Sequence, residues 1–222
     1  MRLYIHTTPN TQLIPTNYHS KLVGVLHKWL GKDNDDHGKI SLYSFSSLHN
    51  AKFENGKITC QHGAKFFISF YDANKAKKVV KSILESPEMF AGMIVNDLTI
   101  EEDKDLSNRE VFLFASPIFV KRTCIGEKNG KEFTFNDSES STVMTDTLKA
   151  KMQEAGLEPD DDLEVKFDKS YQQKKSTIFW YRDISMRVNK CPVIIKGSPE
   201  SKLFAWNVGI GNSTGIGLGA IY

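Results

Sequence analysis

Hydrophobic residues recur along the first half of the chain with two alternating periods. Leu3 and Ile5 alternate with more polar neighbours, a two-residue period that predicts a short strand with one buried face. Apolar residues between Leu22 and Leu30 recur with the helical period on one face, which predicts an amphipathic helix. Asp72 is expected to cap a second helix, and three further strands are expected at residues 40–45, 65–71 and 98–101. This order of strand, helix, strand, strand, helix and strand predicts a ferredoxin-like unit.

The same order returns after a charged stretch at residues 101–108. Helices are expected at residues 140–155 and from Ser198 to Val208, where a cap residue is followed by a first-turn proline and an acid. Strands are expected at residues 110–120, 132–135, 163–167, 186–195 and 216–222, whereas residues 172–183 fit no element. Pro117 indicates an edge or a bulge in the first of these strands. We therefore expect the α+β class, with two tandem ferredoxin-like (RRM-like) βαββαβ units and a C-terminal glycine-rich loop. The expected domains are residues 1–105 and residues 106–222.

Composition indicates an ordinary globular protein. Of the 222 residues, 40% are hydrophobic and 25% are charged, which argues against disorder. Cys60, Cys124 and Cys191 are far apart and have no paired spacing, so neither a zinc site nor a disulfide framework is expected. The sequence contains no signal-peptide pattern and no apolar run long enough to cross a bilayer. We expect a cytoplasmic protein with no membrane partner.

Charge is unevenly distributed, although the net charge is only +2. Between Lys169 and Lys202 there are eight basic residues and two acids, whereas the preceding stretch, residues 158–168, contains six acids and one lysine. A local excess of positive charge suits a ligand with a phosphate backbone. A solvated surface without a partner explains the pattern equally well.

The C-terminal segment contains five glycines between Gly209 and Gly219. Glycine tolerates positive φ and lets a backbone approach a ligand closely, and successive N–H groups in such a turn can form a concavity that binds anions. No Gly-Lys-Ser/Thr follows, so the segment is not a P-loop, and its position excludes a dinucleotide-binding motif. A tight connection between a helix and a strand is the common alternative.

A resemblance to a known family covers nearly the whole chain. The C-terminal segment at residues 209–219 begins with glycine, a hydrophobic residue and glycine. Five residues follow, and then the same triplet returns. This pattern resembles the C-terminal signature of the repeat-associated RNA-binding superfamily, in the form found in the CRISPR-associated Cas-six family. The matching residues are Gly209, Ile210, Gly211, Gly217, Leu218 and Gly219. The opening strand at residues 1–5, the helix at residues 22–30 and the Ser116-Pro117-Ile118 step also look like the family.

The resemblance implies a metal-independent endoribonuclease without a cofactor. Family members cut precursor CRISPR RNA within each repeat, with the neighbouring 2′-hydroxyl as nucleophile. The products are a 2′,3′-cyclic phosphate and a 5′-hydroxyl. This reaction needs a base, an acid and positive charge near the phosphorane. The implied ligand is CRISPR repeat RNA, both precursor and mature, and a homodimer and a CRISPR effector complex are further assemblies to test.

Two histidines and a lysine are the catalytic candidates. His27 lies away from the apolar stripe of the first helix, at a point where the family places a catalytic histidine or tyrosine. His37 lies in the loop that often carries the family's main catalytic histidine, and Lys39 opens the strand where relatives carry a lysine near the phosphorane. Each is otherwise an ordinary surface residue. His19 is the next histidine to test, and Lys52 is the reserve lysine.

Basic residues of the second unit are candidate contacts for RNA phosphates, although lysine is usually a solvated surface residue. The candidates are Arg187, Lys190, Lys196, Lys121 and Arg122. Aromatic residues can stack on bases or simply fill the core; those considered are Tyr4, Tyr43, Trp180 and Tyr181. A different function is a non-catalytic scaffold subunit that holds repeat RNA. Paired histidines near the first helix favour the enzyme, because a protein that only binds RNA does not need them.

Overall fold

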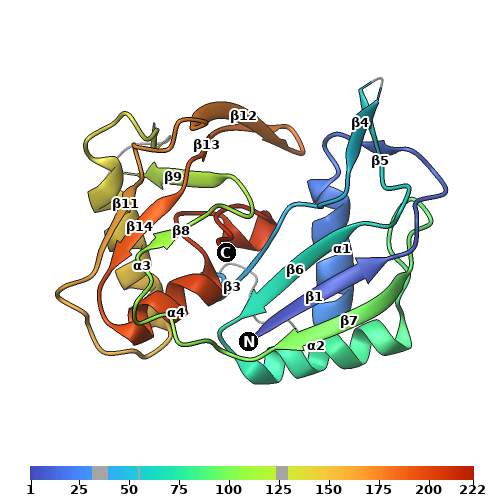
Figure 1. Cartoon of the computed structure of the whole chain (residues 1–222), viewed down its shortest axis with the longest axis horizontal. Helices are drawn as coiled ribbons and strands as arrows, with labels where there is room; N and C mark the ends of the chain where they lie inside the picture. Colours follow the sequence, from blue (N-terminus) through green and yellow to red (C-terminus); the bar gives the residue numbers. More distant parts are fainter. Residues whose placement is uncertain (32–39, 55, 124–129) are drawn as a thin grey trace.

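The first half of the chain forms one ferredoxin-like unit in the computed structural model, which describes residues 1–31, 40–54, 56–123 and 130–222 (Figure 1). Its elements are β1 (Arg2–Thr7), α1 (His19–Leu30), β3 (Tyr43–Phe45), β6 (Lys65–Phe70), α2 (Ala73–Glu85) and β7 (Val95–Glu101). The sheet is antiparallel with the order β3-β6-β1-β7. This is the topology that the hydrophobic periods predict, since the two central strands come from the first and third strand positions of the unit.

Local chemistry explains the two helices of this unit. The stripe of α1 is buried at Leu22, Leu26 and Trp29, and packs against α2 and the sheet. As predicted, the side chain of Asp72 caps α2 by accepting a hydrogen bond from the backbone N–H of Asn74 at 2.8 Å. No helix in the described ranges is long and apolar enough to cross a membrane.

A small sheet beside this unit was not expected from the sequence. It joins β2 (Ile14–Pro15), β4 (Lys52–Glu54) and β5 (Lys57–Thr59) in the order β2-β5-β4. Every residue of β4 is exposed, so the hairpin lacks the alternation of buried and exposed residues by which strands are recognised.

The second half forms another ferredoxin-like unit. Its elements are β8 (Val111–Phe112), α3 (Ser140–Glu154), β11 (Glu164–Phe167), β14 (Val193–Lys196) and α4 (Pro199–Val208). The sheet has the order β11-β14-β8 and gains a fourth position from the bridge between Phe114 and Ile221. The strand predicted at residues 216–222 is therefore reduced to that bridge, preceded by the 3₁₀ turn η1 (Thr214–Ile216).

A further sheet extends from the second unit. It contains β9 (Ile118–Arg122), β10 (Lys131–Phe133), β12 (Lys175–Tyr181) and β13 (Ile184–Lys190) in the order β10-β9-β13-β12. The strand predicted at residues 110–120 breaks into β8 and β9 around Pro117, and the strand predicted at residues 186–195 breaks into β13 and β14 before Val193. A proline follows β13 at Pro192, and proline cannot donate a ladder hydrogen bond. Residues 172–183, which fitted no element, contain β12.

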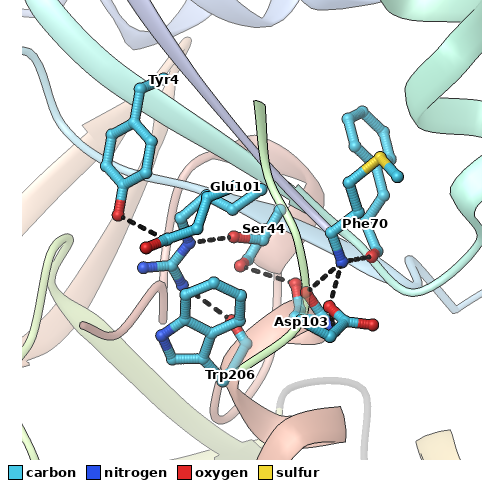
Figure 2. A network of polar contacts seen from close by, with 10 residues as sticks. Tyr4, Ser44, Phe70, Glu101, Asp103 and Trp206 are labelled. Atoms are coloured by element: carbon cyan, nitrogen blue, oxygen red, sulfur yellow. Dashed lines mark hydrogen bonds and ion pairs between the residues drawn. The ribbon is translucent and has the colours of Figure 1, made fainter. Parts of the chain in front are cut away.

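The two units are joined through the sheet of the first unit. Side chains alternate along β1, so Leu3 and Ile5 face the helices, whereas Arg2 and Tyr4 face the second unit. The buried Arg2 guanidinium donates to the backbone oxygens of Trp206 at 2.9 Å and Ile221 at 2.8 Å. Around it, Figure 2 shows Tyr4 bonded to Glu101, and the hydroxyl of Ser44 donates to the backbone oxygen of Asn207 at 3.0 Å.

Candidate functional site

The glycine-rich loop begins where α4 ends, and the structure explains its glycines by close backbone approach. Gly209, Gly211, Gly217 and Gly219 all have positive φ. A Cβ at Gly211 would lie 2.2 Å from the carbonyl oxygen of Phe119, and a Cβ at Gly219 would lie 2.0 Å from that of Ile210. Because neither backbone oxygen can move easily, only glycine fits at these two positions.

The loop reaches across to the first unit. Its 3₁₀ turn η1 lies against α1 and β3. A Cβ at Gly217 would lie 2.6 Å from the ring of Phe45 and 3.2 Å from the ring of His19. The hydroxyl of Tyr43 also donates to the carbonyl oxygen of Gly215 at 3.5 Å. A segment near the end of the chain is thus packed against the helix that carries His19 and His27.

The four signature glycines are themselves buried. The N–H groups of Gly209, Gly217 and Gly219 donate to backbone oxygens of the protein at 2.8 to 3.1 Å. Among the loop residues 209–219, only Ser213 is fully exposed, and its φ of 60° is uncommon for a residue other than glycine. The glycines therefore shape the loop, and a ligand would meet residues 212–216 first.

The candidate catalytic residues are only partly described. His27 lies in the last turn of α1 with a half-buried side chain, and its carbonyl oxygen accepts the N–H of Gly31 at 3.1 Å. His37 and Lys39 lie outside the described residues. Ile40, the residue after Lys39, lines a pocket of about 400 Å³ together with Ser41, Lys151 and residues 211–214.

His19 lies at the other end of α1 and is buried between aromatic rings. Its imidazole stacks on Tyr18 with centroids 4.4 Å apart and meets the edge of Phe179 at 4.7 Å. Burial, and secondarily the charge of Lys190, lowers the pKa of His19 to about 4. Its Nε2 is buried and has no hydrogen-bond partner. His19 is consequently a neutral imidazole at neutral pH.

Two of the five basic candidates lie on the side of the extended sheet that faces the loop. The backbone N–H of Lys121 donates to the side chain of Asn212 at 2.8 Å, and its side chain lines a pocket of about 720 Å³ beside Ser213. Lys190 is half-buried near His19, and burial lowers its pKa, with a further contribution from Lys175.

The other three basic candidates point elsewhere. Arg122 forms an ion pair with Asp146 of α3. Arg187 is exposed between the buried residues Met186 and Val188, so it projects from the opposite face of β13. Lys196 is exposed on β14, opposite Glu164 in the register. The structure thus brings Lys121 to the loop and Lys190 to His19, but places these three elsewhere.

The sequence did not lead us to predict a role for Lys151. It is buried in α3, and its ammonium donates to the carbonyl oxygen of Gly209 at 3.3 Å and reaches Val208 and Thr214 at 3.5 Å. Burial lowers its pKa to about 7. Lys151 thus connects the start of the loop, at Val208 and Gly209, to Thr214 in its middle. A signal was present, because Lys151 lies three residues after Leu148, on the buried stripe of α3.

Two ferredoxin-like units and a glycine-rich loop that packs against the first of them define the class as proteins built from tandem ferredoxin-like units. The family model described as "CRISPR associated protein Cas6, C-terminal" matches residues 100–222. The chain therefore belongs to the Cas6 family, the family that the sequence resembles. No curated protein matches the sequence.

Solved structures share the fold over the whole chain. A structure described as a Cas6-related gene from Pyrococcus furiosus is 23% identical with a TM-score of 0.85, and the match covers 100% of this chain and 97% of that chain. A RAMP protein described as binding different RNA substrates is 21% identical with a TM-score of 0.84, covering 100% and 98%. A Cas6 product complex is 11% identical with a TM-score of 0.69, covering 99% and 98%. At these identities, the likeness shows the fold.

Proposed function

We propose that this protein binds precursor CRISPR RNA and cuts it within the repeats, without a metal ion, by attack of the 2′-hydroxyl beside the cut. The observation that carries the proposal is the packing of the glycine-rich loop against α1 and β3 of the first unit. An RNA strand resting on residues 212–216 would lie beside α1, the helix that carries His27. Membership of the Cas6 family and the likeness to a Cas6 product complex support the same reaction.

In this proposal, residues 1–105 supply the chemistry and residues 106–222 hold the RNA. His27 and His37 act as the acid and base, since the pKa of a free imidazole lies near neutral pH. Lys39 stabilises the charge that develops on the phosphorane. No metal ion is required because the substrate itself carries the nucleophile.

The RNA backbone is held by the exposed part of the loop and by basic side chains. Lys121 lies beside the loop and Lys190 lies near His19, so we expect their removal to weaken binding more than removal of Arg122, Arg187 or Lys196. Removal of a side chain that binds a phosphate should also reduce the salt dependence of RNA binding. The four signature glycines act by keeping residues 212–216 in place.

Cleavage of a labelled RNA that carries the host's CRISPR repeat, with EDTA present, tests the proposal. Wild type should make one cut in the repeat and leave a cyclic phosphate, and His27→Ala and His37→Ala should each slow the cut about 100-fold or more. His62→Ala, which changes an exposed histidine outside the site, is the matched control and should cut normally.

Other results would change the assignment. Normal cutting by both variants would move the chemistry to His19 or another residue. Tight binding of repeat RNA without any cut would make the protein a scaffold.

A further inference from the structure

A second pocket lies between the two units, separate from the pocket next to Ile40. It has a volume of about 300 Å³ and takes its walls from both halves of the chain. Aromatic, hydroxyl and basic side chains line it, and none of its lining residues is acidic; they include Tyr18, His19, Phe53, Thr177, Phe179 and Lys190. Its size is at the lower end of the range for small-ligand sites and suits one planar ring system.

His19 lines this pocket, and one of its ring nitrogens has no hydrogen-bond partner among the described residues. The side chain is 8% exposed, and its Nε2 is one of two buried side-chain polar atoms in the described part of the chain without a hydrogen-bond partner. A buried nitrogen without a partner is costly. A ligand that offered a ring nitrogen, amino group or carbonyl oxygen at this point would remove the cost.

Two positive charges without an acidic partner in the described ranges lie at the edge of the same pocket. Lys190 and Lys175 are directly opposite each other in the register of β12 and β13. Neither has an ion-pair partner among the described residues, and like charges directly opposite each other destabilise a sheet. An anion between the two ammonium groups would relieve the repulsion.

We propose that this pocket binds one unpaired nucleotide of the repeat RNA. Its base lies against Phe179 and hydrogen-bonds to His19, and its phosphate lies between Lys190 and Lys175. A base on an aromatic face and a phosphate on lysines are the usual contacts of single-stranded RNA. The proposal rests on RNA binding as the function, and it adds a position at which the protein distinguishes one nucleotide from its neighbours.

An abasic scan of the repeat tests this site apart from cleavage. The RNA carries a 2′-O-methyl group at the cut, so that it binds without reacting, and one base at a time is removed. With wild type, one abasic position should weaken binding about tenfold. With Phe179→Ala, removal of that same base should cost less than threefold, and the other positions should keep their wild-type penalties.

Two further variants keep the test decisive if Phe179→Ala is unstable. Lys175→Met changes an exposed side chain, and should weaken binding and lower the salt slope by about one unit. Leu84→Ala, with a side chain 77% exposed on α2, is the control and should leave the abasic profile unchanged. Thermal unfolding of each variant establishes that it is folded.

The outcomes separate the two proposals. An identical abasic profile in wild type and Phe179→Ala, with a normal salt slope in Lys175→Met, would overturn the nucleotide site and leave the endoribonuclease standing. If wild type does not bind repeat RNA at all, both proposals are wrong. If removal of one particular base weakens binding to wild type but not to Phe179→Ala, the nucleotide site is supported.

Discussion

The guanidinium carbon of Arg2 lies 3.4 Å from the ring centroid of Trp206, 204 residues later in the chain. The same group lies 3.8 Å from the ring of Phe67 and donates to three oxygens, two of which belong to the second unit. One cation on the first strand therefore attaches α4 and the bridge at Ile221 to the sheet of the first unit.

Replacement of Arg2 should destabilise the whole protein. Arg2→Met leaves the carbonyl oxygens of Trp206 and Ile221 buried without donors, and we expect a loss of about 3 kcal/mol in the free energy of unfolding. Arg2→Lys should lose less, because it keeps the charge but not the planar fork. Urea unfolding measures both, with Lys77→Met on the exposed face of α2 as control. Equal stability of Arg2→Met and the control would contradict the role of Arg2.

Gly211→Ala and Gly24→Ala should have opposite effects on stability. A Cβ at Gly211 would lie 2.2 Å from the carbonyl oxygen of Phe119, and the φ of this residue, +77°, is unfavourable for alanine. We therefore expect the free energy of unfolding to fall by roughly 2 kcal/mol or more. Gly24 is exposed in α1 with nothing within 4 Å, so alanine there should add about 0.5–1 kcal/mol. Thermal or urea unfolding compares them. A neutral Gly211→Ala would mean that the loop is less rigid than its contacts imply.

Lys151 should make the protein more stable as the pH rises above 7. Its pKa in the folded protein is about 7, whereas the unfolded lysine has an ordinary pKa of 10.5, so between these values the unfolded chain binds more protons. The free energy of unfolding then rises with pH, by at most about 1.4 kcal/mol per unit. Urea unfolding of wild type and Lys151→Met at pH 7 and pH 9 measures this difference. Lys149→Met on the same helix is the control, and a shared slope in all three proteins would refute the prediction.

His19 should remain neutral down to about pH 5. Its folded pKa of about 4 is below the ordinary 6.5, so stability falls as the pH drops from 6.5 towards 4, where the unfolded chain binds the extra proton. The imidazole proton shifts in NMR spectra, assigned with His19→Phe, follow this titration. Lys190→Met should raise the pKa, because the charge of Lys190 contributes to the shift. A midpoint near 6.5 would show that His19 is solvated.

Much of the fold could be predicted because the hydrophobic period is strong where elements pack on a single face. The helices α1 and α2 followed from apolar stripes and from the cap at Asp72. Strand β12 was missed because none of its residues is fully buried, so burial imposes little pattern on it. Pro117 indicated an edge or a bulge but not the break between β8 and β9, and the break before Val193 was missed.

The site was harder to predict than the fold. The glycine signature located the loop, but its partners on the first unit are more than 150 residues away in sequence, and only tertiary packing brings them together. For the same reason, no sequence pattern indicated that Lys121 lies beside the loop and Lys190 near His19, while Arg187 points away. The assignment of His27, His37 and Lys39 depends on the family resemblance and stays a prediction.

The loop at residues 209–219 also imposes an order on biosynthesis. The ribosome makes α1 and β3 long before the segment that packs on them, although the first sheet can already pair its four strands. The packing of the loop against α1 and β3 is therefore completed only when the loop has emerged and docked. A nascent chain that has folded its first unit would still lack the face that the loop contributes, so the first unit folds before the candidate site is complete.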